Sequence, residues 1–448
     1  QARNRPGEGS TAPMAVGSVF TEGHRASALR PEACEAVGAS VERRGRSRSN
    51  RGEAIAHAVA SAHSESAGSR RPLEKSGEKP HYPLRKEEVL ASRYKVLGLL
   101  GDGTFGRVVL AHDQREDRNV AVKIIRNIER YAENGRIEAE ILREIRSSDA
   151  WGLSRCALLL GTFMHRDGFF CLVMEHLGVS LHNLLKQNSY RGYWMQDVQS
   201  FALQLLRALR FLHHQIQLTH TDLKLENVLL ESAEPHMVSR FPREGMRPRR
   251  RGSGSTKTAA EYMRPASNQI KLIDFGNAVF EHESHPTTIN TRQYRGPEVI
   301  LHIGWSERSD LWSVGCMLME LYTGELLFNT RSESEHLALM EKILEPLPQY
   351  LLATARSSVK AAYLERNVGP DGETWRLRWP TRGGEGASSS STRSRRYVAT
   401  RRRLSELVLE SHAALADCAG LLLAADPSSR PSALEALRHP LFEATFED

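Results

Sequence analysis

The segment His220-Thr221-Asp222-Leu223-Lys224-Leu225-Glu226-Asn227 is the most informative stretch of this 448-residue chain, together with Asp274-Phe275-Gly276 downstream. Asp222 can accept a proton from a hydroxyl group, and Lys224 beside it can neutralise developing negative charge. Asn227 and Asp274 offer the hard oxygen ligands that suit Mg2+. Each residue alone would more often be a turn or cap residue. Their joint order and spacing predict the transfer of a phosphoryl group.

A glycine-rich segment lies upstream, where a phosphate cover is needed. Gly101-Asp102-Gly103-Thr104-Phe105-Gly106-Arg107-Val108 follows the apolar stretch from Tyr94 to Leu100. We expect two strands and a turn there, with glycines that let the backbone approach phosphate oxygens. In isolation, an ordinary glycine-bearing β-turn explains this spacing equally well.

Val120-Ala121-Val122-Lys123-Ile124-Ile125 is a β-branched run that contains one lysine. A buried strand gives an ammonium group no solvation, so Lys123 needs a carboxylate partner. The next helix, predicted from about Glu133 to Ile145, supplies candidates. Glu138 is preferred because it lies one helical turn before Leu142 and can share its inward face, and Glu140 is the second choice. The alternative is that all acids of this helix are solvated.

With these motifs in place, the chain from about Tyr94 to Phe442 resembles the eukaryotic protein kinases, and most closely the LAMMER (Clk-type) dual-specificity kinases. The stretch from Glu335 to Leu344 closely matches the helix that names that family, with mild departures at Leu339 and Lys342. Thr221 is the family's usual residue between His220 and Asp222, and Arg395-Arg396-Tyr397-Val398 resembles a basic segment of the family. The resemblance implies the α+β two-lobed kinase fold, with a small β-rich N-lobe and a larger, mainly helical C-lobe.

The resemblance also implies ATP and Mg2+ as cofactors and assigns residues to them. The predicted catalytic residues are Asp222, Lys224, Lys123 and Glu138, and the predicted metal ligands are Asn227 and Asp274. Met174 to Gly178 corresponds to the gatekeeper and hinge, where backbone groups near Glu175 and Leu177 would pair with adenine. The predicted nucleotide-binding set is Gly101, Asp102, Gly103, Thr104, Phe105, Gly106, Val108, Ala121, Lys123, Met174, Glu175, Leu177 and Leu229.

Other kinase landmarks follow in order. Glu298 of Gly296-Pro297-Glu298 is expected to pair with Arg430, Asp310 to brace the catalytic loop, and His220 to organise that loop without reacting. Thr221 stands where most kinases have an arginine that pairs with a phosphorylated activation segment. Since threonine cannot make that pair, we hypothesise an enzyme that is active without activation-loop phosphorylation.

The predicted organisation is a disordered basic, Ser-rich tail (1–88), a kinase N-lobe (89–178) and a kinase C-lobe (179–445), with insertions near 233–268 and 383–392. The first insertion separates Val228 to Leu230 from Ile270 to Ile273, which are expected to pair as strands and aim Asn227 and Asp274 at one metal site. Alternatively, part of this insertion is an unspliced or mispredicted segment. The second insertion is interpreted as a Gly/Ser linker.

Composition limits the remaining possibilities. The chain is 40% hydrophobic and has no run of about eighteen apolar residues, so a core is expected and a membrane span is not. Its five cysteines lack metal-type spacing, which fits a reducing compartment. The net charge of +7 is concentrated in Arg43 to Arg51, Arg247 to Arg251 and Arg393 to Arg403, which are interpreted as solvated loops or tails because of their Ser, Gly and Pro content.

The leading functional hypothesis is a monomeric Ser/Thr and Tyr kinase, and the resemblance implies arginine/serine-rich splicing factors as its substrates. It is expected in the nucleus, with the cytoplasm as a second location, and a weak RNA contact through the basic insertions is an additional hypothesis. A Dyrk-like CMGC kinase is the main alternative, although its Tyr-x-Tyr segment is replaced by Asn290-Thr291-Arg292-Gln293-Tyr294. A pseudokinase scaffold is disfavoured by the intact Lys123, Asp222, Asn227 and Asp274.

Overall fold

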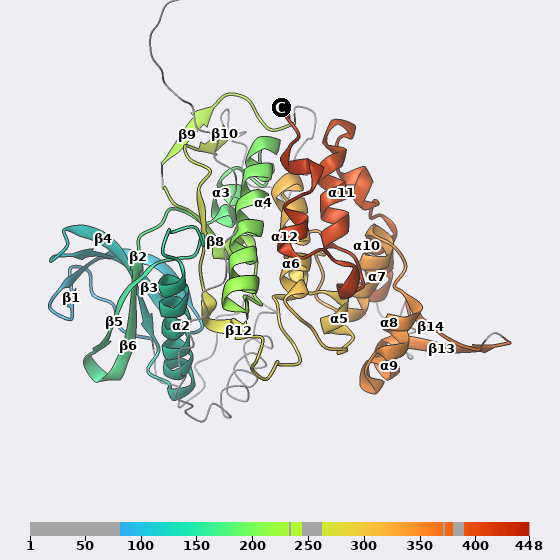
Figure 1. Cartoon of the computed structure of the whole chain (residues 1–448), viewed down its shortest axis with the longest axis horizontal. Helices are drawn as coiled ribbons and strands as arrows, with labels where there is room; N and C mark the ends of the chain where they lie inside the picture. The colour runs from blue at the N-terminus through green and yellow to red at the C-terminus, as the bar shows by residue number, and fades with distance from the viewer. Residues whose placement is uncertain (1–80, 233, 244–261, 371, 380–388, 448) are drawn as a thin grey trace, which may run out of the picture. The chain divides into compact units, whose positions relative to one another are not determined.

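The computed structural model describes residues 81–232, 234–243, 262–370, 372–379 and 389–447. They form a β-rich lobe and a larger helical lobe (Figure 1), as predicted. The predicted tail lies outside the described residues up to position 80, and residues 81–88 lead into the first strand. No helix in the described ranges combines the length and apolar character that crossing a bilayer requires.

The N-lobe contains one antiparallel sheet with the strand order β1-β2-β3-β4-β6-β5. Gly103 faces Gly106 at the end of the β2–β3 hairpin, so the predicted glycine-rich turn is confirmed. The predicted β-branched run lies within the fourth strand. The bounds are β1 (Val89–Leu90), β2 (Tyr94–Gly103), β3 (Gly106–Asp113), β4 (Arg118–Ile125), β5 (Leu159–His165) and β6 (Phe169–Glu175).

Each face of this sheet is covered by different residues. Side chains alternate along a strand, so Ile125, Phe170 and Leu172 point to one face, where they join helix α2 (Glu129–Ser148) in the main core. The helix extends beyond the predicted range of 133–145 at both ends. Alternate residues of the same strands, such as Ile124 and Cys171, form a separate cluster on the other face, which Tyr82 covers.

The C-lobe is built around α6 (Arg308–Thr323), which is buried on nearly all sides. Helix α4 (Met195–Arg210) is followed directly by the π-helical turn Phe211–Ile216. The other helices are α3 (Leu181–Gln187), α5 (Pro297–Ile300), α7 (Glu333–Ile343), α8 (Gln349–Thr354), α9 (Ser357–Tyr363), α10 (Ser389–Ala399), α11 (Ala413–Leu422) and α12 (Ala433–Ala436).

Four two-stranded sheets accompany these helices. The pairs are β7 (Leu218–Thr219) with β12 (Val279–Phe280), β8 (Val228–Leu230) with β11 (Ile270–Leu272), β9 (Pro235–Val238) with β10 (Tyr262–Pro265), and β13 (Leu364–Gly369) with β14 (Gly372–Leu377). The β8–β11 pair confirms the prediction that these strands meet across the insertion. Because β8 follows Asn227 directly and β11 ends two residues before Asp274, their pairing brings both side chains to one end of the sheet.

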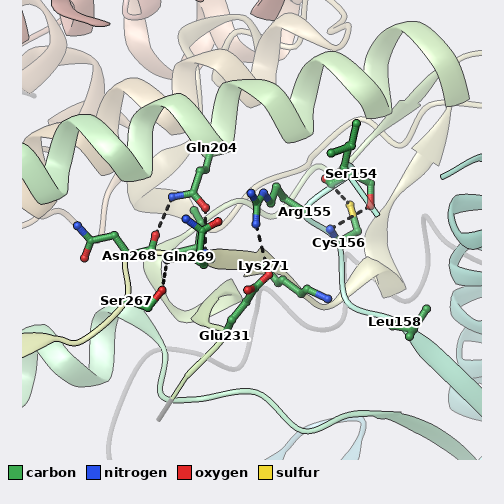
Figure 2. A network of polar contacts seen from close by, with 12 residues as sticks. Ser154, Arg155, Cys156, Leu158, Gln204, Glu231, Ser267, Asn268, Gln269 and Lys271 are labelled. Carbon is green, nitrogen blue, oxygen red and sulfur yellow. Dashed lines mark hydrogen bonds and ion pairs between the residues drawn. The ribbon is translucent and has the colours of Figure 1, made fainter. Parts of the chain in front are cut away.

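Polar contacts fix this pair of strands in place (Figure 2). Gln204 of α4 donates to the carbonyl of Asn268 at 2.6 Å and accepts from the amide of Ile270 at 3.1 Å. On the other side, Leu272 donates its amide to the carbonyl of Arg155 at 2.7 Å, and its carbonyl accepts from Ala157 at 2.8 Å. The loop that leads from α2 to β5 is therefore hydrogen-bonded to the strand that precedes Asp274.

The described flanks of the 233–268 insertion are part of the C-lobe. Arg264 makes a bidentate ion pair with the buried Asp197, at 2.8 and 2.9 Å, and the Tyr262 hydroxyl donates to the Gly192 carbonyl at 2.7 Å. Residues 233 and 244–261 lie outside the described residues. The insertion thus leaves and re-enters the domain through two paired strands, β9 and β10.

The second predicted insertion needs a correction. Residues 383–388 of the predicted linker lie outside the described residues, but 389–392 begin α10, which continues through much of the basic segment 393–403 that was interpreted as a loop. Val398 is buried in the core, and Ser394 hydrogen-bonds Glu335 of α7. Packing against α7 stabilises a helix that the composition alone does not suggest.

Candidate active site

Lys123 connects the two lobes. From β4, its Nζ lies 2.8 Å from both carboxylate oxygens of Glu138 on α2 and 3.0 Å from Oδ1 of Asp274. Burial alone would lower the pKa of Lys123, but the two carboxylates outweigh it and raise that pKa. Lys123 in turn lowers the pKa of Asp274. The predicted pair with Glu138 is confirmed, and the second choice, Glu140, is exposed.

The glycines of the β2–β3 hairpin serve two different purposes. A Cβ on Gly106 would lie 2.2 Å from the Ile124 carbonyl oxygen, so packing within the sheet requires glycine there. A Cβ on Gly101 would contact nothing within 4 Å, and one on Gly103 would meet only the Gly106 carbonyl at 3.8 Å. No neighbouring protein atom accounts for these two glycines, which suits a backbone that must approach a phosphate closely.

The catalytic loop is held by Asp310 of α6, as predicted. Its carboxylate accepts hydrogen bonds from the amides of His220 at 2.8 Å and Thr221 at 3.0 Å. His220 Nε2 donates to the Ile273 carbonyl at 3.1 Å, and its ring centroid lies 5.0 Å from that of Phe275. His220 therefore connects the loop to the Asp-Phe-Gly segment, which agrees with its predicted organising role.

Asp222 is buried and has a defined set of partners. Its Oδ2 accepts from Lys224 Nζ at 2.6 Å, and its Oδ1 accepts from the amide and the hydroxyl of Thr291 at 3.1 and 2.7 Å. A carboxylate can accept about four hydrogen bonds, so these three leave one site, on Oδ2, for a substrate hydroxyl. Burial would lower the pKa of Lys224, but Asp222 raises it, so Lys224 is a cation at neutral pH. The part played by Thr291 had no signal in the sequence.

Asn227 and Asp274 fit the magnesium site predicted for them. Asn227 Nδ2 donates to the Asp222 carbonyl at 2.9 Å, so its amide oxygen remains as an acceptor. Asp274 adopts a left-handed conformation, with φ 65° and ψ 69°, and its Oδ1 is engaged by Lys123. The described ranges contain no cluster of three or more His, Cys, Asp or Glu side chains suited to a metal. Two protein ligands suit Mg2+ that keeps water and nucleotide oxygens in its shell.

The predicted hinge is anchored by the side chain of Glu175. Its Oε1 accepts from the Leu158 amide at 2.7 Å and from Lys271 Nζ at 2.6 Å. Leu177 lies between this anchor and Gly178, whose amide donates to the Leu230 carbonyl at 2.8 Å. The remaining predicted adenine contacts follow the strand register, in which Val108 faces Lys123, Ala121 faces Met174, and Leu229 bridges to Ser180. Their contact with a nucleotide stays a prediction.

Thr221 also forms hydrogen bonds at both ends of the activation segment, with Asn277 and with Asn290. Its hydroxyl donates to the Asn277 carbonyl at 2.7 Å, and its own carbonyl accepts from the amide and the side chain of Asn290, both at 3.0 Å. Asn290 has φ 61°, a conformation that asparagine tolerates better than most residues. Beyond it, Arg295 forms a 2.9 Å ion pair with Glu333 at the start of α7. These contacts hold the segment through unmodified side chains and backbone groups. The sequence did not single out Asn290 for this role.

The comparisons with known proteins agree with this geometry. The family model described as "Protein kinase domain" matches residues 94–442. Serine/threonine-protein kinase AFC3 of Arabidopsis thaliana is 39% identical over 84% of this chain and 88% of its own length. Dual specificity protein kinase CLK4 of Homo sapiens is 36% identical over 82% of this chain and 69% of its own length. A crystal structure of a kinase domain aligns with a TM-score of 0.70 and 37% identity, covering 81% of this chain and 98% of that one. The chain therefore belongs to the protein kinase family, within the LAMMER (Clk-type) group of dual-specificity kinases.

Proposed function

We propose that this kinase transfers the γ-phosphate of Mg-ATP to serine, threonine and tyrosine hydroxyls, with arginine/serine-rich splicing factors as its substrates. One observation carries the reaction: Lys123 contacts both Glu138 and Asp274, which joins the nucleotide lobe to the metal-ligand segment. Lys123 would hold the α- and β-phosphates in the position that this contact fixes. Magnesium, when bound by Asn227 and Asp274, would neutralise phosphate charge.

Asp222 and Lys224 would act on the substrate side. The free acceptor site on Asp222 Oδ2 would orient the attacking hydroxyl and receive its hydrogen bond. Lys224, 2.6 Å from the same oxygen, would stabilise negative charge that develops on the transferred group. Thr291 holds Asp222 from the other side, so the carboxylate is positioned before a substrate arrives.

The choice of arginine-rich substrates is supported by acidic residues beside the catalytic loop. Glu226 is exposed and lies between Lys224 and Asn227 in the sequence. Glu320 is buried on α6, and burial first, with the charge of Glu226 adding to it, raises its pKa to about 7. Tyr294 of the activation segment donates to Glu320 at 2.5 Å. An exposed carboxylate four residues after Asp222 in the sequence would attract guanidinium groups that flank a target serine.

Steady-state assays on arginine/serine, neutral and acidic peptides test this proposal. Wild type should prefer the arginine/serine peptide, and Glu226→Gln should lower kcat/KM for that peptide by roughly tenfold while changing the neutral peptide little. Glu231→Gln is a matched control, because Glu231 is also exposed but forms an ion pair with Arg155. A preference for the acidic peptide would overturn the substrate proposal, whereas mapped phosphoserine and phosphotyrosine would support dual specificity.

Weak RNA contact is proposed in addition, since α10 exposes the basic side chains of Arg393, Arg395 and Arg396. RNA affinity that falls steeply with salt would support it, and absent binding at low salt would exclude it. A monomeric enzyme in the nucleus, with a cytoplasmic fraction, fits the proposed substrates and is tested by light scattering and by cell fractionation.

A further inference from the structure

Residues 81–88, here called the strap, cross the face of the N-lobe sheet opposite α2. Tyr82 anchors the strap, with only 7% of its surface exposed. Its ring lies 5.0 Å from that of Phe169 and 5.2 Å from that of His165 in an edge-to-face arrangement. Its hydroxyl donates to Glu88 at 2.6 Å, and burial raises the pKa of this hydroxyl to about 12. The strap is therefore a packed part of the domain.

One arginine connects the strap to the glycine-rich hairpin. Arg107 on β3 donates through Nη1 to the backbone carbonyl of Tyr82 at 2.9 Å. Through Nε and Nη2 it contacts Oδ2 of Asp102 at 3.2 and 3.1 Å. Asp102 is its cross-strand neighbour on β2, between Gly101 and Gly103. A single guanidinium group thus joins the strap to both strands of the hairpin close to its turn.

His81 makes a weaker contact with the same hairpin. Its Nδ1 lies 3.5 Å from Oδ1 of Asp102. Burial, followed by the charge of Arg126, lowers the pKa of His81, so the ring is neutral at pH 7 and forms no ion pair with the carboxylate. The connection between the strap and the turn end of the hairpin therefore depends on Arg107, whereas Glu87 and Glu88 bond the far end of β2 at Lys95 and Val96.

The strand pairing of the glycine-rich hairpin is irregular, so contacts from the strap would stabilise the hairpin on this side. Its two strands shift register between Val96 and Gly98 and again between Leu99 and Gly101, which weakens the ladder just before the turn. On the inner side, the turn is held by the Phe105 ring against Tyr131, with centroids 5.4 Å apart, and by the Arg126 amide bonded to the Phe105 carbonyl. The Arg107 contacts hold the turn on the outer side, where the strap lies.

We propose that the strap, acting through Arg107, holds the glycine-rich hairpin in the position that binds the nucleotide phosphates. This inference rests on the proposed role of the hairpin in binding ATP. A hairpin restrained on both sides loses less conformational freedom when the nucleotide binds, so the strap strengthens ATP binding. Arg107 and Tyr82 are then positioning residues, and the phosphoryl-transfer step itself does not depend on them.

Full-length Arg107→Ala, Tyr82→Ala and the double variant test the proposal, with ATP varied at saturating peptide. Each single variant should raise KM for ATP roughly fivefold and leave kcat within about twofold. The double variant should resemble either single variant, because each change breaks the same connection. Arg107→Lys, which can keep one of the contacts, should give an intermediate KM.

Lys95→Ala is the matched control, because Lys95 pairs with Glu87 at the other end of the strap and does not touch the turn. Its KM for ATP should equal that of wild type. If the effects of Arg107→Ala and Tyr82→Ala multiply, or if Arg107→Ala leaves KM unchanged, the proposal is wrong. If Tyr82→Ala does not fold, Tyr82→Phe replaces it. Tyr82→Phe should raise KM for ATP by a smaller factor, and its effect should likewise not multiply with that of Arg107→Ala. A wild-type enzyme without ATP-dependent activity would contradict the proposed function instead.

Discussion

Lys123 and Arg430 are both cations held by carboxylates inside the protein, but their surroundings differ. Arg430 binds Glu298 through two hydrogen bonds of 2.7 and 2.6 Å, and the two side chains are 0% and 1% exposed. The remaining Arg430 donors reach backbone carbonyls, among them that of Ala424 at 2.7 Å. The side chains of Lys123 and Asp274 remain 14% and 33% exposed.

The two sites also differ in their balance of charge. Arg430 and Glu298 neutralise each other, whereas Lys123 contacts two carboxylates, those of Glu138 and Asp274. The first site is closed and saturated, as expected of a pair that holds the C-lobe together. The second carries excess negative charge and stays accessible, as expected of a site that receives a cation with its nucleotide. Exposure and charge balance, more than the presence of a buried ion pair, distinguish the functional site from the structural one.

Asp274→Asn should produce the largest loss of activity. A small loss would contradict the distinction drawn between the two sites. Loss of the carboxylate should lower kcat/KM by roughly 10³- to 10⁴-fold, because a metal ligand is removed at the phosphates. The melting temperature should change little, since Lys123 keeps Glu138 as its partner. Peptide phosphorylation and thermal unfolding measured on the same preparation check both halves of the expectation. A large loss of stability would mean that Asp274 is a structural residue like Glu298.

Arg430→Leu should show the opposite pattern. It leaves Glu298 buried without its cation, which should cost about 3–5 kcal/mol of unfolding free energy. Activity per folded molecule should fall far less than in Asp274→Asn. Urea denaturation gives the free energy, and the double variant Arg430→Leu/Glu298→Leu is the control, because removing both charges should restore part of the stability. No recovery in the double variant would show that packing of the guanidinium, not its charge, is what matters.

Glu320 adds a third case to this comparison, a buried carboxylate with no ion-pair partner among the described residues. Its pKa is raised from 4.5 to about 7, mainly by burial, so the folded state binds the proton more tightly than the unfolded state. The unfolding free energy should therefore decrease as pH rises from about 4.5 to 7, by roughly 3 kcal/mol from this group. Glu320→Gln should flatten that part of the pH profile, as measured by denaturation at several pH values. An unchanged profile would mean that Glu320 is charged throughout.

Phosphatase treatment should have the smallest effect. Thr221 and Asn290 hold the activation segment through hydrogen bonds that need no phosphate. Dephosphorylated enzyme should keep its activity to within about twofold, confirmed by mass spectrometry and peptide assays. Asn290→Ala should lose activity both before and after treatment. Near-complete inactivation of wild type by phosphatase would refute the hypothesis.

The sequence predicted the residues whose functional groups the reaction requires. Lys123, Asp222, Asn227 and Asp274 could be identified because phosphoryl transfer needs those functional groups in that order, and helical periodicity was enough to select Glu138. The strands β8 and β11 could be paired across a long insertion because their apolar runs flank the two metal ligands.

The contacts that the sequence did not reveal depend on how the chain folds back on itself. Thr291 reaches Asp222 only because Asn290 adopts a left-handed conformation and returns the segment to Thr221. Helix α10 was mistaken for a loop because its Ser and Thr residues give a weak helical signal, while the burial of Val398 that stabilises it comes from the tertiary structure.

The loop between α2 and β5 has a consequence for inhibitor design. Asp149 ends α2 and accepts from the amides of Leu153 and Ser154 at 2.7 and 2.9 Å, and Arg155 then binds the backbone of Leu272, two residues before Asp274. Helix α2 and the Asp-Phe-Gly segment are thus parts of one hydrogen-bonded unit. Compounds that bind only after either element has moved outward would have to break these hydrogen bonds. Ligands that bind without such a movement are therefore the better starting point for inhibitor design.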